Sequence, residues 1–136
     1  QSPSSAASDV YKRQVVNWIN DLNSKITPII TGNLIFTVSN DGYLYVVEKN
    51  KGNILRITDL FKNYKIKKRK EIEPIGFVIN NTNLYLTNSD GKIIIADLSE
   101  GKVLNVEKVS GDIVSEPFIF NNNLYVVRNG SIVQYN

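Results

Sequence analysis

The residues of this chain that could do chemistry are mostly carboxylates and lysines. Histidine and cysteine are absent from the 136 residues, which removes the usual acid-base group at neutral pH and the usual thiolate nucleophile. Asp41, Asp90 and Asp97 lie near asparagine or serine residues, and carboxylate and amide oxygens are ligands that calcium prefers. Their spacing is not that of an EF-hand loop, and Asp41 and Asp90 each precede a glycine, as turn residues often do. We therefore expect these aspartates to shape turns rather than to bind a metal.

The remaining candidate residues also have structural interpretations. Glu48 and Glu116 have no evident partner that would tune either one as a general acid. Four tyrosines stand on apolar runs and are expected to pack at interfaces rather than to form a ligand platform: Tyr43, Tyr45, Tyr85 and Tyr125. The sequence therefore predicts no catalytic residue, no cofactor-binding residue, no cofactor and no metal ligand. It predicts that the protein is not an enzyme.

The chain has a formal charge of +3, and the excess of basic residues is concentrated in the run "KIKKRK", from Lys65 to Lys70. Such a run is most often a solvated loop, so we expect a solubilising insertion and no nucleic-acid partner. In the alternative interpretation the run binds anionic lipid headgroups or nucleic acid, with Phe61 and Tyr64 nearby to add stacking. No apolar run approaches the roughly 18 residues of a bilayer-spanning helix.

Short apolar runs separated by turn residues fill the chain from Ile26 onward, without a helical stripe of useful length. This pattern predicts an all-β fold. The same hairpin, a strand, a turn and a second strand, is predicted three times. The first is "NLIFTVS", Asp41-Gly42 and "YLYVVE", and the second is "NLYLTNS", Asp90-Gly91 and "KIIIADL". The third is "NLYVV", Asn129-Gly130 and "SIVQY". We expect Asp-Gly to supply the positive φ angles of a type I′ turn, and a later glycine to turn the third strand into a fourth.

The hairpins belong to a longer repeat. Asp41 and Asp90 lie 49 positions apart, and so do Gly52 and Gly101. Three prolines each precede an apolar strand: Pro28, Pro74 and Pro117. Four strands in a period of roughly forty residues are the size of one propeller blade. A single blade cannot cover both of its faces, so neighbouring blades must pack against each other.

We therefore predict a partial β-propeller of four-stranded antiparallel blades, belonging to a larger ring of about eight blades. The predicted parts are a remnant strand at 15–22, a blade at 26–58, an inter-blade loop at 59–71, a blade at 72–109 and a partial blade at 113–136. The first 14 residues, "QSPSSAASDVYKRQ", differ in composition from the rest and resemble a translated sequencing-adapter scar. The alternative for residues 1–14 is a serine-rich linker or disordered tail.

The units resemble the pyrroloquinoline-quinone-like (PQQ-like) repeat. The resemblance rests on "PIITGNLIFTVSNDGYLYVVEKNKGNILRI", "PIGFVINNTNLYLTNSDGKIIIADLSEGKVLNV" and "PFIFNNNLYVVRNGSIVQYN", and it covers residues 15–136. The family closes its fourth strand on a tryptophan, which here is matched only by Trp18 in "VVNWINDL". The later units carry Arg56 and Asn105 at the matching positions.

Degenerate repeats of this kind are similar to those of periplasmic outer-membrane assembly lipoproteins, the B-subunit scaffold of the β-barrel insertion machinery. This resemblance implies a non-enzymatic scaffold that binds envelope proteins, in the periplasm or at the outer membrane, with membrane association through a lipid anchor. The candidate recognition surfaces are residues 59–73 and the exposed strand edges. The alternative is part of a PQQ-dependent quinoprotein dehydrogenase, which would need a stacking tryptophan, a calcium site and, in many members, a vicinal disulfide.

Overall fold

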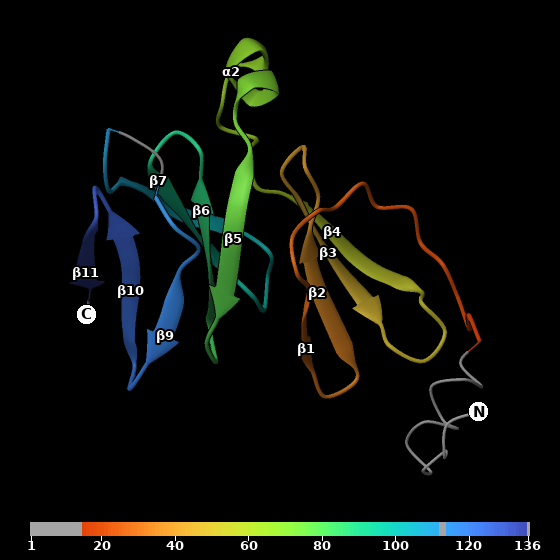
Figure 1. Ribbon diagram of the computed structural model, residues 1–136. Coiled ribbons are helices and arrows are strands. Elements are labelled where there is room, and N and C mark those ends of the chain that lie inside the picture. Colours follow the sequence, from red (N-terminus) through yellow and green to blue (C-terminus); the bar gives the residue numbers. More distant parts are fainter. Residues whose placement is uncertain (1–14, 112–113, 136) are drawn as a thin grey trace, which may run out of the picture.

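The computed structural model describes residues 15–111 and 114–135, which form three antiparallel β-sheets standing side by side (Figure 1). The first sheet contains β1 (Ile29–Thr31), β2 (Leu34–Val38), β3 (Tyr43–Glu48) and β4 (Ile54–Asp59), and the second contains β5 (Pro74–Ile79), β6 (Asn83–Asn88), β7 (Lys92–Asp97) and β8 (Val103–Lys108). The third sheet contains β9 (Phe118–Phe120), β10 (Asn123–Arg128) and β11 (Ser131–Tyr135). In each sheet, neighbouring strands follow one another in sequence, so the predicted all-β meander is confirmed.

The hairpins after β2 and β6 differ from the predicted type. Gly42 and Gly91 have positive φ angles of 89° and 78°, whereas Asp41 and Asp90 do not. In the first hairpin the N–H of Gly42 donates to the carbonyl of Ser39 over 3.0 Å. This pattern is a turn completed by a glycine bulge, because a type I′ turn needs two successive residues with positive φ. The type I′ prediction is therefore wrong for both Asp-Gly hairpins.

Residues 15–22 form no strand, contrary to the prediction. The segment is held against the first sheet by side chains instead. The indole N–H of Trp18 donates to the carbonyl of Lys49 over 2.9 Å, and the amide of Asn20 donates to the carbonyl of Gly52. A strand requires a ladder of backbone hydrogen bonds, and none of the described strands provides one here. The predicted scar at residues 1–14 lies outside the described part of the chain.

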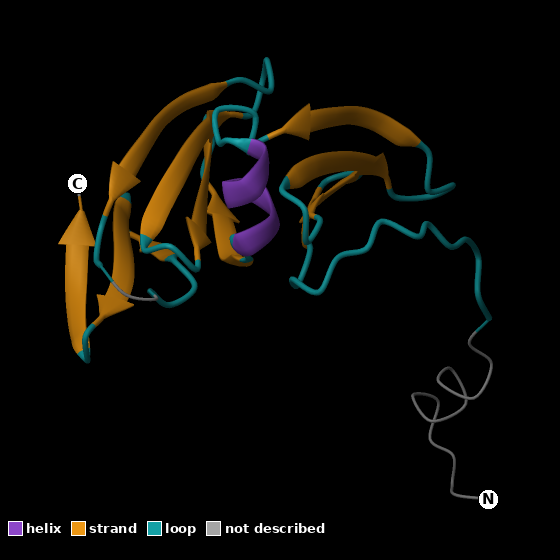
Figure 2. Ribbon diagram, turned by 90° about the horizontal axis from the view of Figure 1, so that it is seen from above, coloured by secondary structure: helices purple, strands orange, loops and turns teal. Residues whose placement is uncertain are grey.

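The predicted inter-blade loop contains a short helix, α2 (Ile66–Glu71), and its first residue, Asp59, ends β4. Figures 1 and 2 show α2 standing between the first and second sheets and beyond their ends. Lysine, arginine and glutamate are good helix formers, so this run can close a helical turn. The N–H of Arg69 donates to the carbonyl of Lys65 over 2.9 Å. The helix within the predicted inter-blade loop was not predicted from the sequence.

Two hydrophobic clusters fill the spaces between the sheets. The cluster between the first and second sheets is made of Phe36, Val38, Leu44, Val46, Leu60, Phe61, Ile72, Phe77, Leu84, Leu86, Ile94 and Ala96. The cluster between the second and third sheets has only four fully buried members, Ile93, Val109, Val114 and Val126. Ile93 and Ile94 are successive residues of β7 in different clusters, so this strand is covered on both faces, as its continuous apolar run predicted.

Candidate functional site

The strand registers show which residues hold equivalent positions in the repeat. Leu34 and Asn83 each pair with the last residue of the third strand in their own sheet. Phe36 and Tyr85 stand two positions further along and therefore point to the same side as Leu34 and Asn83. The first sheet thus presents two apolar side chains to the second sheet. At the same positions, the second sheet presents an asparagine and a tyrosine to the third.

The receiving faces differ as well. Leu84 pairs with Ala96 in the second sheet, and Leu124 pairs with Tyr135 at the equivalent place in the third. A tyrosine therefore replaces an alanine opposite the polar pair. We call the interface between the first and second sheets the closed interface, and that between the second and third sheets the open interface.

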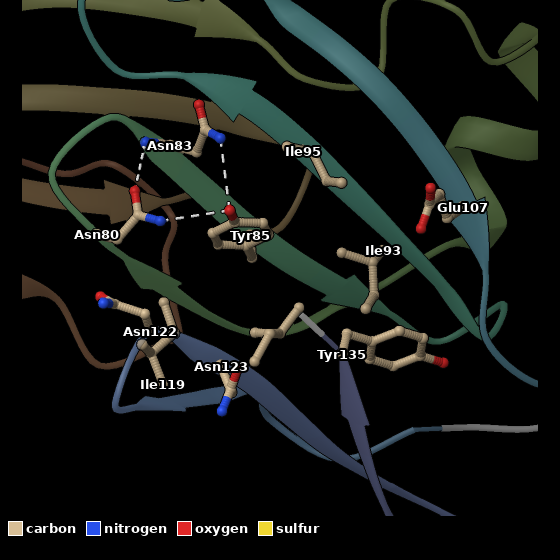
Figure 3. Close-up of a pocket in the computed structure, with 11 residues that line it drawn as sticks. Asn80, Asn83, Tyr85, Ile93, Ile95, Glu107, Ile119, Asn122, Asn123 and Tyr135 are labelled. Carbon is tan, nitrogen blue, oxygen red and sulfur yellow. Dashed lines mark hydrogen bonds between the residues drawn. The ribbon is translucent and has the colours of Figure 1, made fainter.

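The open interface contains a crevice of about 270 Å³ (Figure 3). Its lining residues come from both sheets: Asn80, Asn83, Tyr85, Ile93, Ile95, Glu107, Ile119, Asn122, Asn123, Leu124 and Tyr135. Figure 3 shows Asn80, Asn83 and Tyr85 gathered at one end, with Glu107 and Tyr135 toward the other. The isoleucines and Leu124 form the apolar part of the wall. The crevice therefore combines an amide-rich rim with an apolar wall, a composition common in small-molecule sites.

The rim of the crevice is partly organised by hydrogen bonds. The side-chain amides of Asn80 and Asn83 donate to the hydroxyl oxygen of Tyr85 over 3.3 and 3.4 Å. The carbonyl oxygen of the Asn80 side chain accepts from the N–H of Asn83 over 2.7 Å. Because the Tyr85 oxygen accepts two N–H groups, its own proton points elsewhere and can be donated. Within the described residues, the side chains of Asn122 and Asn123 have no protein hydrogen-bond partner, and Asn123 lies on the face of β10 opposite to Leu124.

A second candidate surface is the segment between the first and second sheets, residues 59–73. Its base is buried through Leu60, Phe61 and Ile72. Arg69 donates to both carboxylate oxygens of Asp59 over 2.9 Å, and its guanidinium lies 5.6 Å from the ring centre of Tyr43. These contacts raise the pKa of Arg69, mainly through the hydrogen bonds to Asp59. One basic residue of the run is therefore committed to holding α2 in place.

The tip of this segment faces solvent. Lys65, Lys67, Lys68 and Lys70 are exposed, and the Ile66 side chain is 76% exposed although it is apolar. We call the residues from 62 to 70 the basic protrusion. Binding residues often lie on loops that a rigid scaffold positions, so this segment is a candidate surface.

A contact between neighbouring units recurs with different residues at the turn between the third and fourth strands of a sheet, which we call the outer rim. The indole of Trp18 covers Gly52, and a Cβ at Gly52 would overlap that ring. Arg56 occupies the same place one unit later, where its guanidinium donates to the carbonyl of Ser99 over 2.9 Å and to that of Leu98. Leu98 is equivalent to Lys49, which accepts from Trp18. Arg56 therefore replaces the tryptophan of the preceding unit as the link between neighbouring units.

Asn105, which holds this position in the third unit, makes a different contact. Its side-chain amide donates to Glu107 over 3.0 Å on the same strand, and its carbonyl oxygen accepts from the N–H of Val106. The repeat places Trp18, Arg56 and Asn105 at equivalent positions, but the sequence does not show that the arginine and the tryptophan make the same contact. The reason is that the carbonyl acceptors lie about one repeat away in sequence.

The carboxylates singled out in the sequence hold turns, as predicted for the aspartates. Asp97 accepts from the N–H groups of Ser99 and Glu100, and these bonds, the one from Ser99 first, lower its pKa. Asp90 accepts from the N–H of Lys92 and from the hydroxyl of Tyr64. Asp41 accepts from the hydroxyl of Ser39. No group of three or more acidic residues that could hold a metal occurs within 15–111 and 114–135.

The two glutamates lie apart. The carboxylate of Glu48 accepts from the N–H groups of Lys51 and Asn50, and these bonds lower its pKa rather than tune it as a general acid. It is therefore a turn residue between β3 and β4. Glu116 packs its side chain over Gly76, where a Cβ would overlap it.

The four tyrosines also separate. Tyr85 packs against the second cluster and lines the crevice, whereas Tyr43 lies under Arg69. Tyr125 stacks on Phe118 with ring centres 4.9 Å apart. Tyr45 pairs with Thr37 and Ile57 within the first sheet. The crevice was not found by sequence reasoning, although an asparagine at the repeat position of Leu34 was a usable signal.

No helix among the described residues is long and apolar enough to span a bilayer.

No protein-family model matches the chain, and no curated protein sequence matches it significantly. Among solved structures, it is similar to BamB from Moraxella catarrhalis, with 16% identity and a TM-score of 0.66 over 87% of this chain and 33% of that chain. It is similar to the quinohemoprotein alcohol dehydrogenase ADHIIG from Pseudomonas putida HK5, with 15% identity and a TM-score of 0.60 over 79% of this chain and 17% of that one. It is also similar to the β-propeller domain of Cps50 (Swd1) from Myceliophteria thermophila, with 12% identity and a TM-score of 0.57 over 69% of this chain and 31% of that chain.

The chain therefore spans about a third or less of the length of each of these structures. At these identities the likeness concerns the fold. Together with the three antiparallel meander sheets, it shows that this chain has the fold of a β-propeller segment.

Proposed function

We propose that the chain belongs to a non-enzymatic propeller that binds protein partners in the cell envelope, in the periplasm or at the outer membrane. The resemblance of its repeats to PQQ-like outer-membrane assembly scaffolds supports this proposal, and so does the structural likeness to BamB from Moraxella catarrhalis. Within the proposal, the three sheets are blades of a larger ring of about eight, and a lipid anchor outside this sequence holds the ring at the membrane. The partners are proteins of the envelope or of outer-membrane assembly.

The observation that carries the proposal is the construction of the basic protrusion. The protrusion directly follows Phe61, which is fully buried in the closed interface, so it is anchored where two sheets meet. Its tip exposes Ile66 among four lysines. Burying the apolar side chain of Ile66 against a partner would release water and stabilise a complex, and the lysines favour an acidic surface around the contact.

The test is site-specific photocrosslinking in envelope preparations. A photoreactive residue at Ile66 should give discrete protein adducts, whereas the same residue at Leu104 on β8, which is also exposed, should not. Replacing Lys67 and Lys68 with glutamate should weaken the Ile66 adducts, because it reverses the charge of the contact. No adduct at Ile66, or equal adducts at Ile66 and Leu104, would contradict the proposal.

The dehydrogenase alternative is tested separately. Reconstitution with PQQ and calcium followed by dye-linked alcohol oxidation would favour it. Trp18, the single tryptophan of the chain, lies on the outer rim of the first sheet against Gly52. We therefore keep the protein-binding proposal as the main one.

A further inference from the structure

The crevice of the open interface lies where the side chains at two repeat positions change from apolar to polar. Asn83 and Tyr85 stand where the first sheet has Leu34 and Phe36, and all four lie on the face turned to the next sheet. Asn83 and Tyr85 therefore place polar groups inside an interface whose equivalent positions are apolar one repeat earlier. We infer that this crevice is a binding site for a neutral, hydroxylated ring of monosaccharide size.

The charge of the lining selects a neutral ligand. Among the described residues that line the crevice, Glu107 is the only charged one, and none is a lysine or an arginine. An anionic group would meet the carboxylate of Glu107 without a compensating cation, which disfavours its binding. One oxygen of Glu107 accepts from Asn105 over 3.0 Å, so the carboxylate is held in place and its other oxygen can accept a ligand hydroxyl.

The polar groups at the rim match hydroxyls in particular. The hydroxyl of Tyr85 is positioned by Asn80 and Asn83 and retains a proton to donate. The side-chain amide of Asn122 offers both a donor and an acceptor, and it has no partner within the described residues. A hydroxyl group both donates and accepts, so several hydroxyls around one ring can satisfy these groups together.

The apolar wall matches the other side of such a ring. Ile93, Ile95 and Leu124 line the crevice beside the amides, and Tyr135 adds an aromatic surface. A sugar ring presents C–H groups on its faces and hydroxyls at its edge, so one face can pack on this wall while the edge reaches the rim. The volume of about 270 Å³ lies just below the range of drug-sized sites, ~300–1,000 Å³, which favours a single ring over a chain of rings.

The test is an NMR titration of the isotope-labelled chain with glucose and with N-acetylglucosamine, and with glucose 6-phosphate as the anionic comparison. At least one of the two neutral sugars should shift the side-chain amide signals of Asn83 and Asn122 in a saturable way. Glucose 6-phosphate should bind several-fold more weakly than glucose. Neither neutral sugar shifting these signals at high millimolar concentration would overturn the inference, and so would equal binding of glucose and glucose 6-phosphate.

Matched tyrosine variants distinguish binding in the crevice from non-specific binding. Tyr85→Phe removes the positioned hydroxyl and should weaken sugar binding by roughly 2- to 10-fold, the contribution of one hydrogen bond. Tyr125→Phe removes a hydroxyl that accepts from Gln134 and lies outside the crevice, so it should leave the affinity unchanged. Asn83→Ala removes an amide that positions the Tyr85 hydroxyl and should weaken binding without unfolding the chain. Equal affinity in wild type, Tyr85→Phe and Asn83→Ala would overturn the inference, whatever the result for the protein-binding proposal.

Discussion

The closed and open interfaces use equivalent positions of the same repeat but are packed differently. In the closed interface Leu34, Phe36 and Leu84 pack in one cluster. Leu60 and Phe61, from the segment between the two sheets, belong to the same cluster. The open interface is fully buried only around its four-residue cluster, and it contains the crevice. A repeated backbone can therefore assign stability to one interface and recognition to the next, by changing a few side chains.

The connections after β4 and β8 continue this contrast. Leu60 and Val109 are equivalent, because their N–H groups donate to the carbonyls of Gly42 and Gly91, over 2.9 and 2.8 Å. The next residue is Phe61 in the closed interface and Ser110 in the open one. A fully buried phenylalanine contributes far more apolar area than a serine, so the closed interface is expected to be the more stable of the two.

The largest expected effect comes from deleting equivalent leucines. Leu84→Ala removes a fully buried side chain from the closed interface and should lower the free energy of unfolding by about 2–5 kcal/mol. Leu124→Ala acts at the equivalent position of the open interface, where the side chain is only partly buried, and should cost about half as much or less. Urea denaturation of both variants measures the difference. Equal losses would show that the two interfaces are equally packed.

A glycine pair separates backbone strain from packing. Gly42 and Gly130 both have positive φ, 89° and 75°, so alanine at either position should cost about 1–2 kcal/mol for the backbone alone. A Cβ at Gly42 would also overlap the ring of Phe61, whereas a Cβ at Gly130 meets nothing within 4 Å. Gly42→Ala should therefore lower the midpoint of thermal unfolding clearly more than Gly130→Ala. Similar midpoints for the two variants would contradict the tight contact between Gly42 and Phe61.

The link at the outer rim gives an intermediate effect. Arg56→Ala removes two charge-assisted hydrogen bonds across the closed interface and should cost about 1.5–3 kcal/mol. Asn105→Ala breaks only contacts within its own strand and should cost less than about 0.5 kcal/mol.

A rescue variant then checks the equivalence of arginine and tryptophan. Arg56→Trp should restore most of the stability lost in Arg56→Ala, because Trp18 fills the same place one unit earlier. Denaturant titration of the three variants measures this, and an Arg56→Trp protein as unstable as Arg56→Ala would refute the equivalence.

The smallest expected effect is a loss of stability at alkaline pH. Burial, and then the charge of Asp90 and its hydrogen bond, raise the pKa of Tyr64 above its ordinary value of 10.0. A group whose pKa is raised on folding contributes stability that is complete below its unfolded pKa and is lost as the pH rises above it. The unfolding midpoint should therefore fall above about pH 10, and Tyr64→Phe should reduce that fall. An identical pH profile in wild type and Tyr64→Phe would exclude this role.

The sequence alone determined the strands, their meander order and the repeat of the fold. Alternating or continuous apolar runs such as "YLYVV" and "KIIIA" are local signals, and Gly42 or Gly91 marks a turn because few other residues adopt a positive φ. The turn roles of Asp41, Asp90 and Asp97 were predictable for the same reason.

The tertiary structure decided what each interface does. Arg56 takes the place of a tryptophan only because Leu98 and Ser99, more than 40 positions away, present their carbonyls to it. The helix at residues 66–71 is held in its place by Arg69, which reaches Asp59. Asn83 and Tyr85 became part of a crevice only when the third sheet packed opposite them. Local pattern fixes the conformation of a strand, whereas the packing of two faces depends on side chains about one repeat apart, which no local pattern specifies.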